Sequence, residues 1–187
     1  MIRIVLDANT LYSSSLRGIL LRLGTRGVIV PLWSEKIQNE WTRNLLRNRP
    51  DLNQEDLERT RQYMAFHFPK GQVCGYESII PALWLPDPND RHVLAVAIYA
   101  KARYIVTSDL NHFPNAILQS YNIEAVSPDE FLFRLIQEKP EHIIFVVRIH
   151  RLSLTRPPKT VEEYLEMLEK QGLDKTAAFL RMCKNDI

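Results

Sequence analysis

The chain has 187 residues, the length of one ordinary domain, and its 45 % hydrophobic and 25 % charged residues are typical of a globular protein and exclude a disordered one. Its Lys and Arg side chains outnumber its Asp and Glu side chains by 24 to 22, which permits a nucleic-acid partner without indicating one. The two cysteines, Cys74 and Cys183, are too few for a disulfide framework. No apolar run is long enough for a membrane span, and no signal region opens the chain. We therefore expect a cytoplasmic protein with no membrane partner.

In the first half of the chain, short apolar runs alternate with amphipathic segments. Residues 2–6 and 28–32 are rich in β-branched side chains and predict two buried strands. Apolar residues at helical spacing, with Ser34 and Asn53 as capping side chains of the two later segments, predict helices over residues 10–23, 34–50 and 53–68. Residues 69–86 contain several Gly and Pro residues, and the pattern predicts only a short strand near residues 78–80.

The second half continues this alternation and then becomes entirely helical. A helix that follows Asp87 leads into a predicted strand at residues 104–106, and a further strand at residues 123–126 precedes a helix that begins at Ser127. After about residue 138, helical patterns alone remain, over residues 140–154, 160–171 and 174–184.

Strands that alternate with helices predict a parallel sheet with right-handed crossovers. We therefore expect an α/β fold in residues 1–138, a parallel sheet with helices on both faces in a three-layer sandwich. Residues 139–187 are expected to form a helical C-terminal extension packed on the same domain. Its first helix is apolar on nearly all sides at residues 143–149, so it should be covered by the domain, by a second copy or by another protein.

Acidic residues fall where the predicted parallel strands end. Asp7 follows the first strand, Asp109 comes just after residues 104–106, and Asp90 lies in the first turn of the helix that leads into that strand. Glu40 lies on the helix after the second strand. Because the carboxyl ends of parallel strands share one edge of the sheet, these carboxylates should lie close together and repel one another unless a cation separates them. Mg²⁺ or Mn²⁺ suits such oxygen ligands, and either ion would polarise a phosphoryl group and activate a water molecule.

Each acid also has a purely structural interpretation. Asp7 and Asp87 suit helix N-caps, and Asp90 suits the positive end of a helix dipole. Asp109 fits a turn and Glu40 a solvated helix surface. The metal interpretation depends on the joint placement of the acids rather than on any one of them.

Four segments together resemble the PIN domain family, over about residues 2–135. They are Leu-Asp-Ala-Asn-Thr-Leu at residues 6–11, Glu40, Asp-Arg-His-Val-Leu-Ala-Val-Ala at residues 90–97 and Ile-Val-Thr-Ser-Asp at residues 105–109. The resemblance implies that four acids are catalytic and hold the metal ion, and that two polar residues orient them. The acids are Asp7, Glu40, Asp90 and Asp109, and the orienting residues are Asn9 and Thr107.

Among PIN proteins, the chain looks most like the toxins of bacterial and archaeal toxin–antitoxin pairs. This resemblance implies an Mg²⁺- or Mn²⁺-dependent endoribonuclease that hydrolyses RNA phosphodiesters, is silenced by a small protein antitoxin and is commonly a homodimer. Two features depart from the pattern. Asp87 lies close enough to the third acid to be mistaken for it, and the helices after residue 138 exceed the usual short toxin.

Two other function classes compete with the nuclease. A Mg²⁺-dependent phosphatase of the haloacid dehalogenase type also begins with a strand ending in Asp, but it needs a second Asp where this chain has Asn9, which cannot act as an acid. A non-catalytic PIN-fold module for RNA binding or protein interaction should have lost at least one acid, and this chain retains all four.

Basic and aromatic residues add weaker signals. Five arginines near the second and third predicted helices could bind phosphates, although interleaved acids favour a solvated surface; they are Arg43, Arg47, Arg49, Arg59 and Arg61. Trp33, Trp41 and Trp84 are expected in the core rather than stacked on bases. No histidine has metal-ligand spacing. His92 and His112 lie near the proposed acids, and both are expected at the surface.

Overall fold

The computed structural model describes residues 1–187 and contains one sheet of four parallel strands in the order β2-β1-β3-β4. The strands are β1 (Ile2–Leu6), β2 (Ile29–Leu32), β3 (Tyr104–Val106) and β4 (Glu124–Val126). Val5 of the central strand pairs with Leu32 on one side and Ile105 on the other. Ile4, Val5 and Leu6 are completely buried, as expected of a parallel strand covered on both faces. All four strands confirm the sequence prediction.

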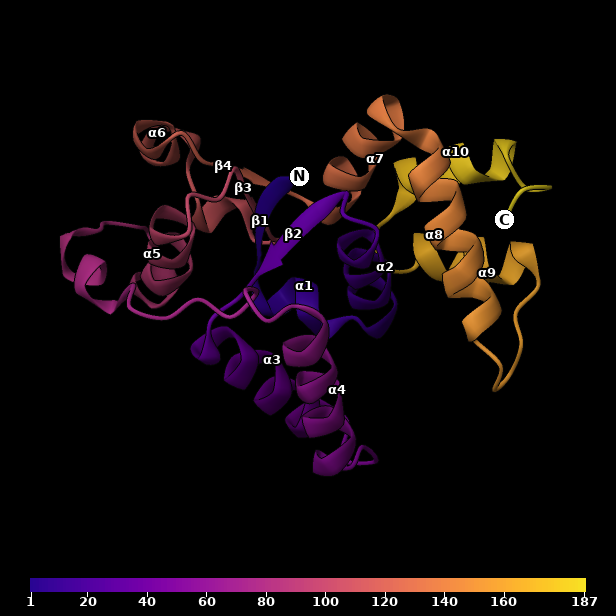
Figure 1. Ribbon diagram of the computed structural model, residues 1–187, viewed down its shortest axis with the longest axis horizontal. Coiled ribbons are helices and arrows are strands. Elements are labelled where there is room, and N and C mark those ends of the chain that lie inside the picture. Colours follow the sequence, from indigo (N-terminus) through magenta and orange to yellow (C-terminus); the bar gives the residue numbers. More distant parts are fainter.

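Helices cover both faces of this sheet (Figure 1). The helices are α1 (Ala8–Tyr12), α2 (Ser14–Thr25), α3 (Glu35–Asn48), α4 (Gln54–His67), α5 (Arg91–Tyr99), α6 (Asn115–Leu118), α7 (Pro128–Glu138), α8 (Pro140–Ser153), α9 (Val161–Glu169) and α10 (Asp174–Met182). Helix α5 packs on β1 and β3, and α2 packs on β2. Tyr104 of β3 contacts Phe131 of α7, with ring centroids 5.7 Å apart. The structure confirms the predicted α/β sandwich with a helical C-terminal region.

Two of the local predictions are wrong. The helix expected over residues 10–23 is divided, because Ser13 is extended and its hydroxyl accepts a hydrogen bond from the Leu16 amide at 3.3 Å, which caps a new helix. The strand expected near residues 78–80 is instead a 3₁₀ helix over Glu77–Ala82. Pro81 has no N–H to donate to a sheet, and the surrounding amides bond locally, Ile79 to the Tyr76 carbonyl at 3.0 Å.

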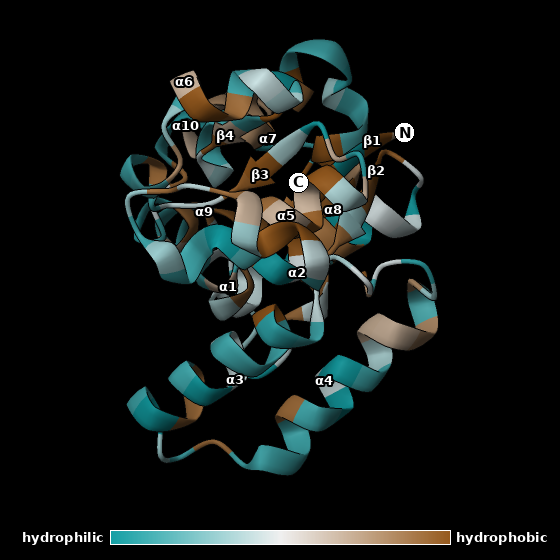
Figure 2. Cartoon of the chain, turned by 90° about the vertical axis from the view of Figure 1, so that its left-hand side faces the viewer, coloured by the Kyte–Doolittle hydropathy of each residue, from teal (hydrophilic) through white to brown (hydrophobic).

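Helices α3 and α4 form an arm that extends from the body of the molecule and is largely hydrophilic (Figure 2). Ser34 and Asn53 cap the two helices as predicted. The apolar face of α3 buries Ile37 and Trp41 completely. The arm is therefore anchored by few large side chains and leaves one long polar face of α3 exposed beside the sheet edge.

The C-terminal helices pack on the sheet domain and on one another. Helix α8 packs on α2 and α7, and α10 packs on α7 and α9. Within α8, Ile143, Val146 and Val147 are buried. The expected complete coverage of this helix is not achieved within one chain, because Phe145 and Leu152 remain 44 % and 54 % exposed. No helix of the structure has both the length and the apolar character required to cross a membrane.

Between α8 and α9, the buried His150 ring lies 2.6 Å (Nδ1) from the Tyr164 hydroxyl. Burial lowers the pKa of His150 from 6.5 to about 4, so the folded chain holds the ring neutral while the unfolded chain protonates it. Protonation of the ring therefore has no effect on folding stability above pH 6.5, and it lowers stability as the pH falls toward 4; at pH 5 its contribution to the loss is about 2 kcal/mol. In urea unfolding at pH 7.5 and pH 5, the wild type should lose about 2 kcal/mol more than His150→Gln, because all other titrating groups are common to the two proteins. Equal losses in the two proteins would contradict this prediction.

Candidate functional site

The four acids expected at the sheet edge all line one groove of about 1070 Å³. Asp7 follows β1, Asp109 follows β3, Asp90 ends a 3₁₀ turn at Pro88–Asp90 just before α5, and Glu40 lies on α3. The rest of the lining is mainly polar and includes Lys36, Asn39, Arg43, Asn44, Arg47 and Asn48 from the exposed face of α3. The groove therefore combines carboxylates from four separate segments with cationic side chains from one helix.

Asp7 is the most buried of the four acids, with 6 % of its surface exposed. One carboxylate oxygen accepts a hydrogen bond from the Ala8 amide at 2.7 Å, so Asp7 also caps α1. The other accepts from the Thr107 hydroxyl at 2.7 Å and from the Asn9 amide group at 3.0 Å. Burial raises the pKa of Asp7 from 3.8 to about 6, although the bonds from Thr107 and Ala8 oppose part of that increase. The capping and site interpretations of this residue are therefore compatible.

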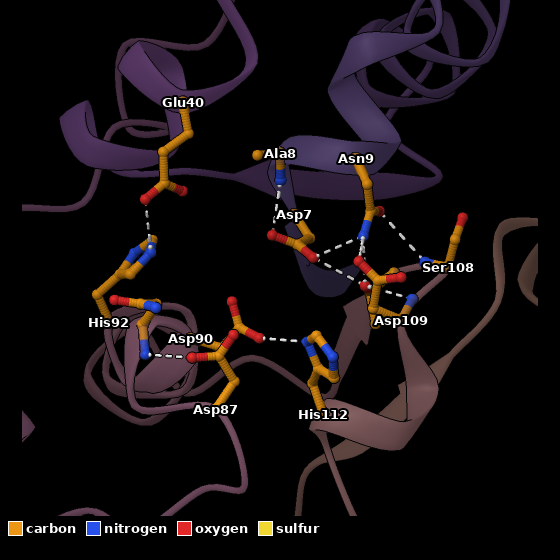
Figure 3. A network of polar contacts seen from close by, with 12 residues as sticks. Asp7, Ala8, Asn9, Glu40, Asp87, Asp90, His92, Ser108, Asp109 and His112 are labelled. Carbon is orange, nitrogen blue, oxygen red and sulfur yellow. Dashed lines mark hydrogen bonds and ion pairs between the residues drawn. The ribbon is translucent and has the colours of Figure 1, made fainter. Parts of the chain in front are cut away.

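Asn9 joins Asp7 to Asp109 (Figure 3). Its side-chain Nδ2 lies 2.9 Å from both the Thr107 hydroxyl and the Asp109 carboxylate, and its Oδ1 accepts from the Ser108 amide at 3.2 Å. Thr107 is completely buried, and its hydroxyl also accepts from the Asp109 amide at 3.1 Å. One amide side chain and one hydroxyl thus fix the relative positions of two carboxylates from opposite ends of the domain sequence.

Asp90 lies opposite this pair and is bonded to a histidine. Its carboxylate is 2.7 Å from Nδ1 of His112, which lies in the turn after Asp109 (Figure 3). Burial raises the pKa of Asp90, with the His112 bond acting against it, and Asp90 in turn raises the pKa of His112. Ligand atoms of Asp87, Asp90 and His112 all lie within 4.8 Å of one another. The nearby Asp87 accepts from the Asn89 amide at 2.8 Å and does not line the groove.

Glu40 reaches the groove from α3 and contacts a second histidine. Its carboxylate lies 3.2 Å from Nε2 of His92, which is 2 % exposed on α5. The other ring nitrogen, Nδ1, is buried without a hydrogen-bond partner. The expectation that both histidines lie near the acids but at the surface is wrong for His92, which is buried, and correct for His112, which is half-exposed and bonded to Asp90. In the sequence, His92 follows Asp90 by two residues and His112 follows Asp109 by three, and this closeness was the available signal that they contact the site.

A divalent cation suits this set of oxygen donors. Asp7, Asp90, Asp109 and Glu40 face the same groove, and no Lys or Arg forms an ion pair with any of them. Hard cations prefer carboxylate oxygens with water completing the coordination. Asp7 and Asp109 are joined through Asn9 and Thr107, whereas Asp90 and Glu40 each lie beside a histidine instead of forming one tight cluster with the other two.

The structure separates the five arginines into two kinds. Arg43 and Arg47 line the groove and pair with no acid. The other three form surface ion pairs: Arg49 with Asp51, Arg59 with Glu55 and Asp56, and Arg61 with Glu35 and Glu58. The mixed-charge interpretation therefore holds for those three only. Lys36, four residues before Glu40 on the same face of α3, also lines the groove, although the sequence analysis did not predict a role for it.

The tryptophans follow the core expectation with one exception. Trp33 and Trp41 are completely buried, whereas Trp84 is 64 % exposed in the segment between the 3₁₀ helix and α5. Trp84 does not line the groove. The prediction of a core position is thus wrong for Trp84.

Comparisons with known proteins match two parts of the chain. Residues 3–111 match the PIN domain model, a segment that holds all six predicted site residues, and residues 128–182 match the VapC50 C-terminal domain model. A Mycobacterium tuberculosis (strain ATCC 25618 / H37Rv) protein named "Putative ribonuclease VapC50" is 36 % identical over 97 residues, which are 52 % of this chain and 57 % of that protein. The match spans little more than half the length of this relative, and no solved structure matches the chain. Because the PIN model covers more than half of the chain, this protein belongs to the PIN domain family.

Proposed function

We propose that this protein is a metal-dependent endoribonuclease that hydrolyses RNA phosphodiesters in the groove at the sheet edge. The observation that carries the proposal is that four carboxylates, none of them ion-paired with Lys or Arg, share one polar groove with three cationic side chains of α3. A nuclease needs both features, acids for a metal ion and cations for the flanking phosphates. The similarity to a protein named as a ribonuclease supports the same activity.

In this proposal, Asp7, Asp90 and Asp109 hold one or two Mg²⁺ or Mn²⁺ ions, and Glu40 lies at the rim. Such an ion, when bound, polarises the phosphodiester and lowers the pKa of the attacking water. The chain itself keeps the carboxylates in place: Asn9 and Thr107 restrain Asp7 and Asp109 through bonds of 2.7–3.0 Å.

Substrate binding would rest on the exposed face of α3. Lys36, Arg43 and Arg47 lie along one helix face, because their spacings of seven and four residues place them on the same side. Their side chains have no acidic partner in the structure and are free to bind successive phosphates. We propose that they place the scissile phosphodiester against the carboxylates.

The biological role extends this proposal. We infer a cytoplasmic toxin of a toxin–antitoxin pair, held inactive by a small protein antitoxin and acting as a homodimer. Support comes from the match of residues 128–182 to the C-terminal domain of a VapC protein, and from the apolar stripe that α8 leaves exposed at Phe145, Ile149 and Leu152.

The test of the reaction is incubation of the purified protein with single-stranded and structured RNA. Cleavage is expected with Mn²⁺ or Mg²⁺, and is expected to stop with EDTA or in Asp109→Asn, because that carboxylate faces the groove directly. Arg3→Gln, an exposed change on β1 away from the groove, serves as the matched control and should cleave normally. Cleavage that survives EDTA would exclude the metal mechanism, and metal binding without cleavage would indicate a non-catalytic PIN module.

We also propose that α8–α10, residues 139–187, fold as part of the same unit as the sheet. The buried faces of α2 and α7 both contact α8. Truncation after Lys139 should therefore expose apolar surface and give an aggregated or partly unfolded chain. Light scattering and circular dichroism measure the result, and a soluble monomer with unchanged unfolding would contradict the proposal.

A further inference from the structure

Arg17 of α2 is a buried cation without an acidic partner. Only 8 % of its surface is exposed, and its guanidinium carbon lies 4.6 Å from the centre of the Trp41 ring. One N–H group, on Nη1, donates to the Leu11 carbonyl, and the guanidinium makes no other hydrogen bond and no ion pair. Burial lowers the pKa of Arg17 to about 10, so the side chain still carries its charge at neutral pH. A buried charge normally has a counter-charge, and here the chain does not supply one.

The free side of this guanidinium opens into a pocket of about 400 Å³ between α2 and α4. Its lining includes two further arginines, Arg22 and Arg59, and the hydroxyl-bearing residues Ser14, Thr60 and Tyr63, but no acid. The remaining nitrogens of Arg17 are not among the polar atoms sealed from solvent without a partner, so they are accessible from this pocket. The pocket shares no residue with the carboxylate groove.

We propose that this pocket binds the carboxylate of an acidic side chain from a partner protein. The planar fork of Arg17 matches a carboxylate with two parallel hydrogen bonds, and the Trp41 ring behind it fixes the orientation of the fork. Tyr63, 47 % exposed at the pocket edge, offers the aromatic contact that is typical of protein interfaces.

A nucleic acid suits the same surface poorly. The exposed acids Glu55, Asp56 and Glu58 lie on α4 around Arg59 and would repel a chain of phosphates, whereas a single carboxylate can enter the pocket between them. Arg22 already donates to the Gly18 carbonyl and the Ser153 hydroxyl, and Arg59 forms ion pairs with Glu55 and Asp56. Arg17 alone therefore offers free donors, which suits one anion and not the extended row of phosphates in a nucleic-acid backbone. A protein partner is therefore favoured, and the inference does not depend on the proposed nuclease activity.

The experiment measures binding of the full chain to a terminally blocked peptide that carries a single glutamate among alanines, and to an oligouridylate RNA of equal length, both in EDTA so that neither metal binding nor cleavage takes place. The glutamate peptide should shift the indole N–H signal of Trp41 in a ¹H–¹⁵N spectrum. Arg17→Gln should weaken its binding by about tenfold or more, as expected for loss of a charge-assisted pair. The exposed Arg59→Gln, which cannot disturb the core, should weaken it by several-fold, and Arg3→Gln should leave it unchanged.

RNA affinity should not depend on Arg17. Binding of the glutamate peptide that is equal in the wild type, Arg17→Gln and Arg59→Gln would overturn the proposal. Loss of RNA binding in Arg17→Gln with unchanged binding of the glutamate peptide would overturn it in favour of a nucleic-acid site. Thermal unfolding of each variant confirms that it is folded before its affinity is compared.

Discussion

Asp7→Asn is expected to abolish RNA cleavage and at the same time to stabilise the metal-free protein. Activity should fall by about a thousandfold or more, because the substitution removes the most buried carboxylate of the groove and weakens cation binding. Stability should rise because the wild-type chain must ionise a carboxyl that burial disfavours. The two effects have opposite sign, which an unfolded or misfolded variant cannot imitate.

The sign of the stability change follows from the pKa of Asp7, which is ordinarily 3.8 and is about 6 in the folded chain. Between these values the unfolded chain has released the proton and the folded chain still holds it. The contribution of Asp7 to stability therefore falls as the pH rises from about 4 to 6, and this destabilisation is complete above pH 6. The full deficit is about 3 kcal/mol, and the lost acceptor of the Thr107 and Asn9 bonds reduces the expected gain to about 1–2 kcal/mol.

Urea unfolding in EDTA at pH 4 and pH 7.5 measures this gain, which should be absent at the lower pH and present at the higher one. Calorimetry with Mn²⁺ should show weaker binding to Asp7→Asn, and affinity of the wild type should decrease below pH 6 as protons compete for the carboxylate. Equal Mn²⁺ affinity for the two proteins would remove Asp7 from the metal site.

Asp90→Asn and Asp87→Asn, three residues apart, are expected to differ by about two orders of magnitude in RNA cleavage. Asp90 lines the groove, and its neutralisation should lower the rate of RNA cleavage by about 100-fold or more, as expected for a metal ligand. Asp87 does not line the groove and accepts a backbone hydrogen bond from Asn89, a role that Asn fills equally well. Its substitution should change cleavage by less than about threefold.

Initial rates at saturating Mn²⁺ and at limiting Mn²⁺ distinguish loss of the ion from loss of chemistry. Equally large defects in Asp87→Asn and Asp90→Asn would instead place the ion among Asp87, Asp90 and His112, whose ligand atoms lie within 4.8 Å of one another. Each of the two variants is thus the control of the other.

Local patterns in the sequence were sufficient for the strands and for most helices. Apart from Arg3, strand β1 consists of apolar residues and is followed directly by Asp7. The caps at Ser34, Asn53 and Thr160 lie next to the helices that they stabilise. Such signals act between neighbouring residues, so the sequence reveals them without a fold. The acids of the groove were predictable for a related reason, since parallel topology alone brings strand ends to one edge.

Contacts between distant segments were decided by the tertiary structure. Nothing near His92 in the sequence indicates that it meets Glu40, and nothing near Arg17 indicates that it stacks on Trp41. The helix break at Ser13 depended on a competition between a side-chain cap and a continuous helix, which local propensity could not resolve. The sequence by itself therefore determined the helices and strands and the chemistry available at the sheet edge. Tertiary packing decided which charged side chains face a groove, which are paired and which are buried without a partner, because these contacts join residues that lie far apart in the chain.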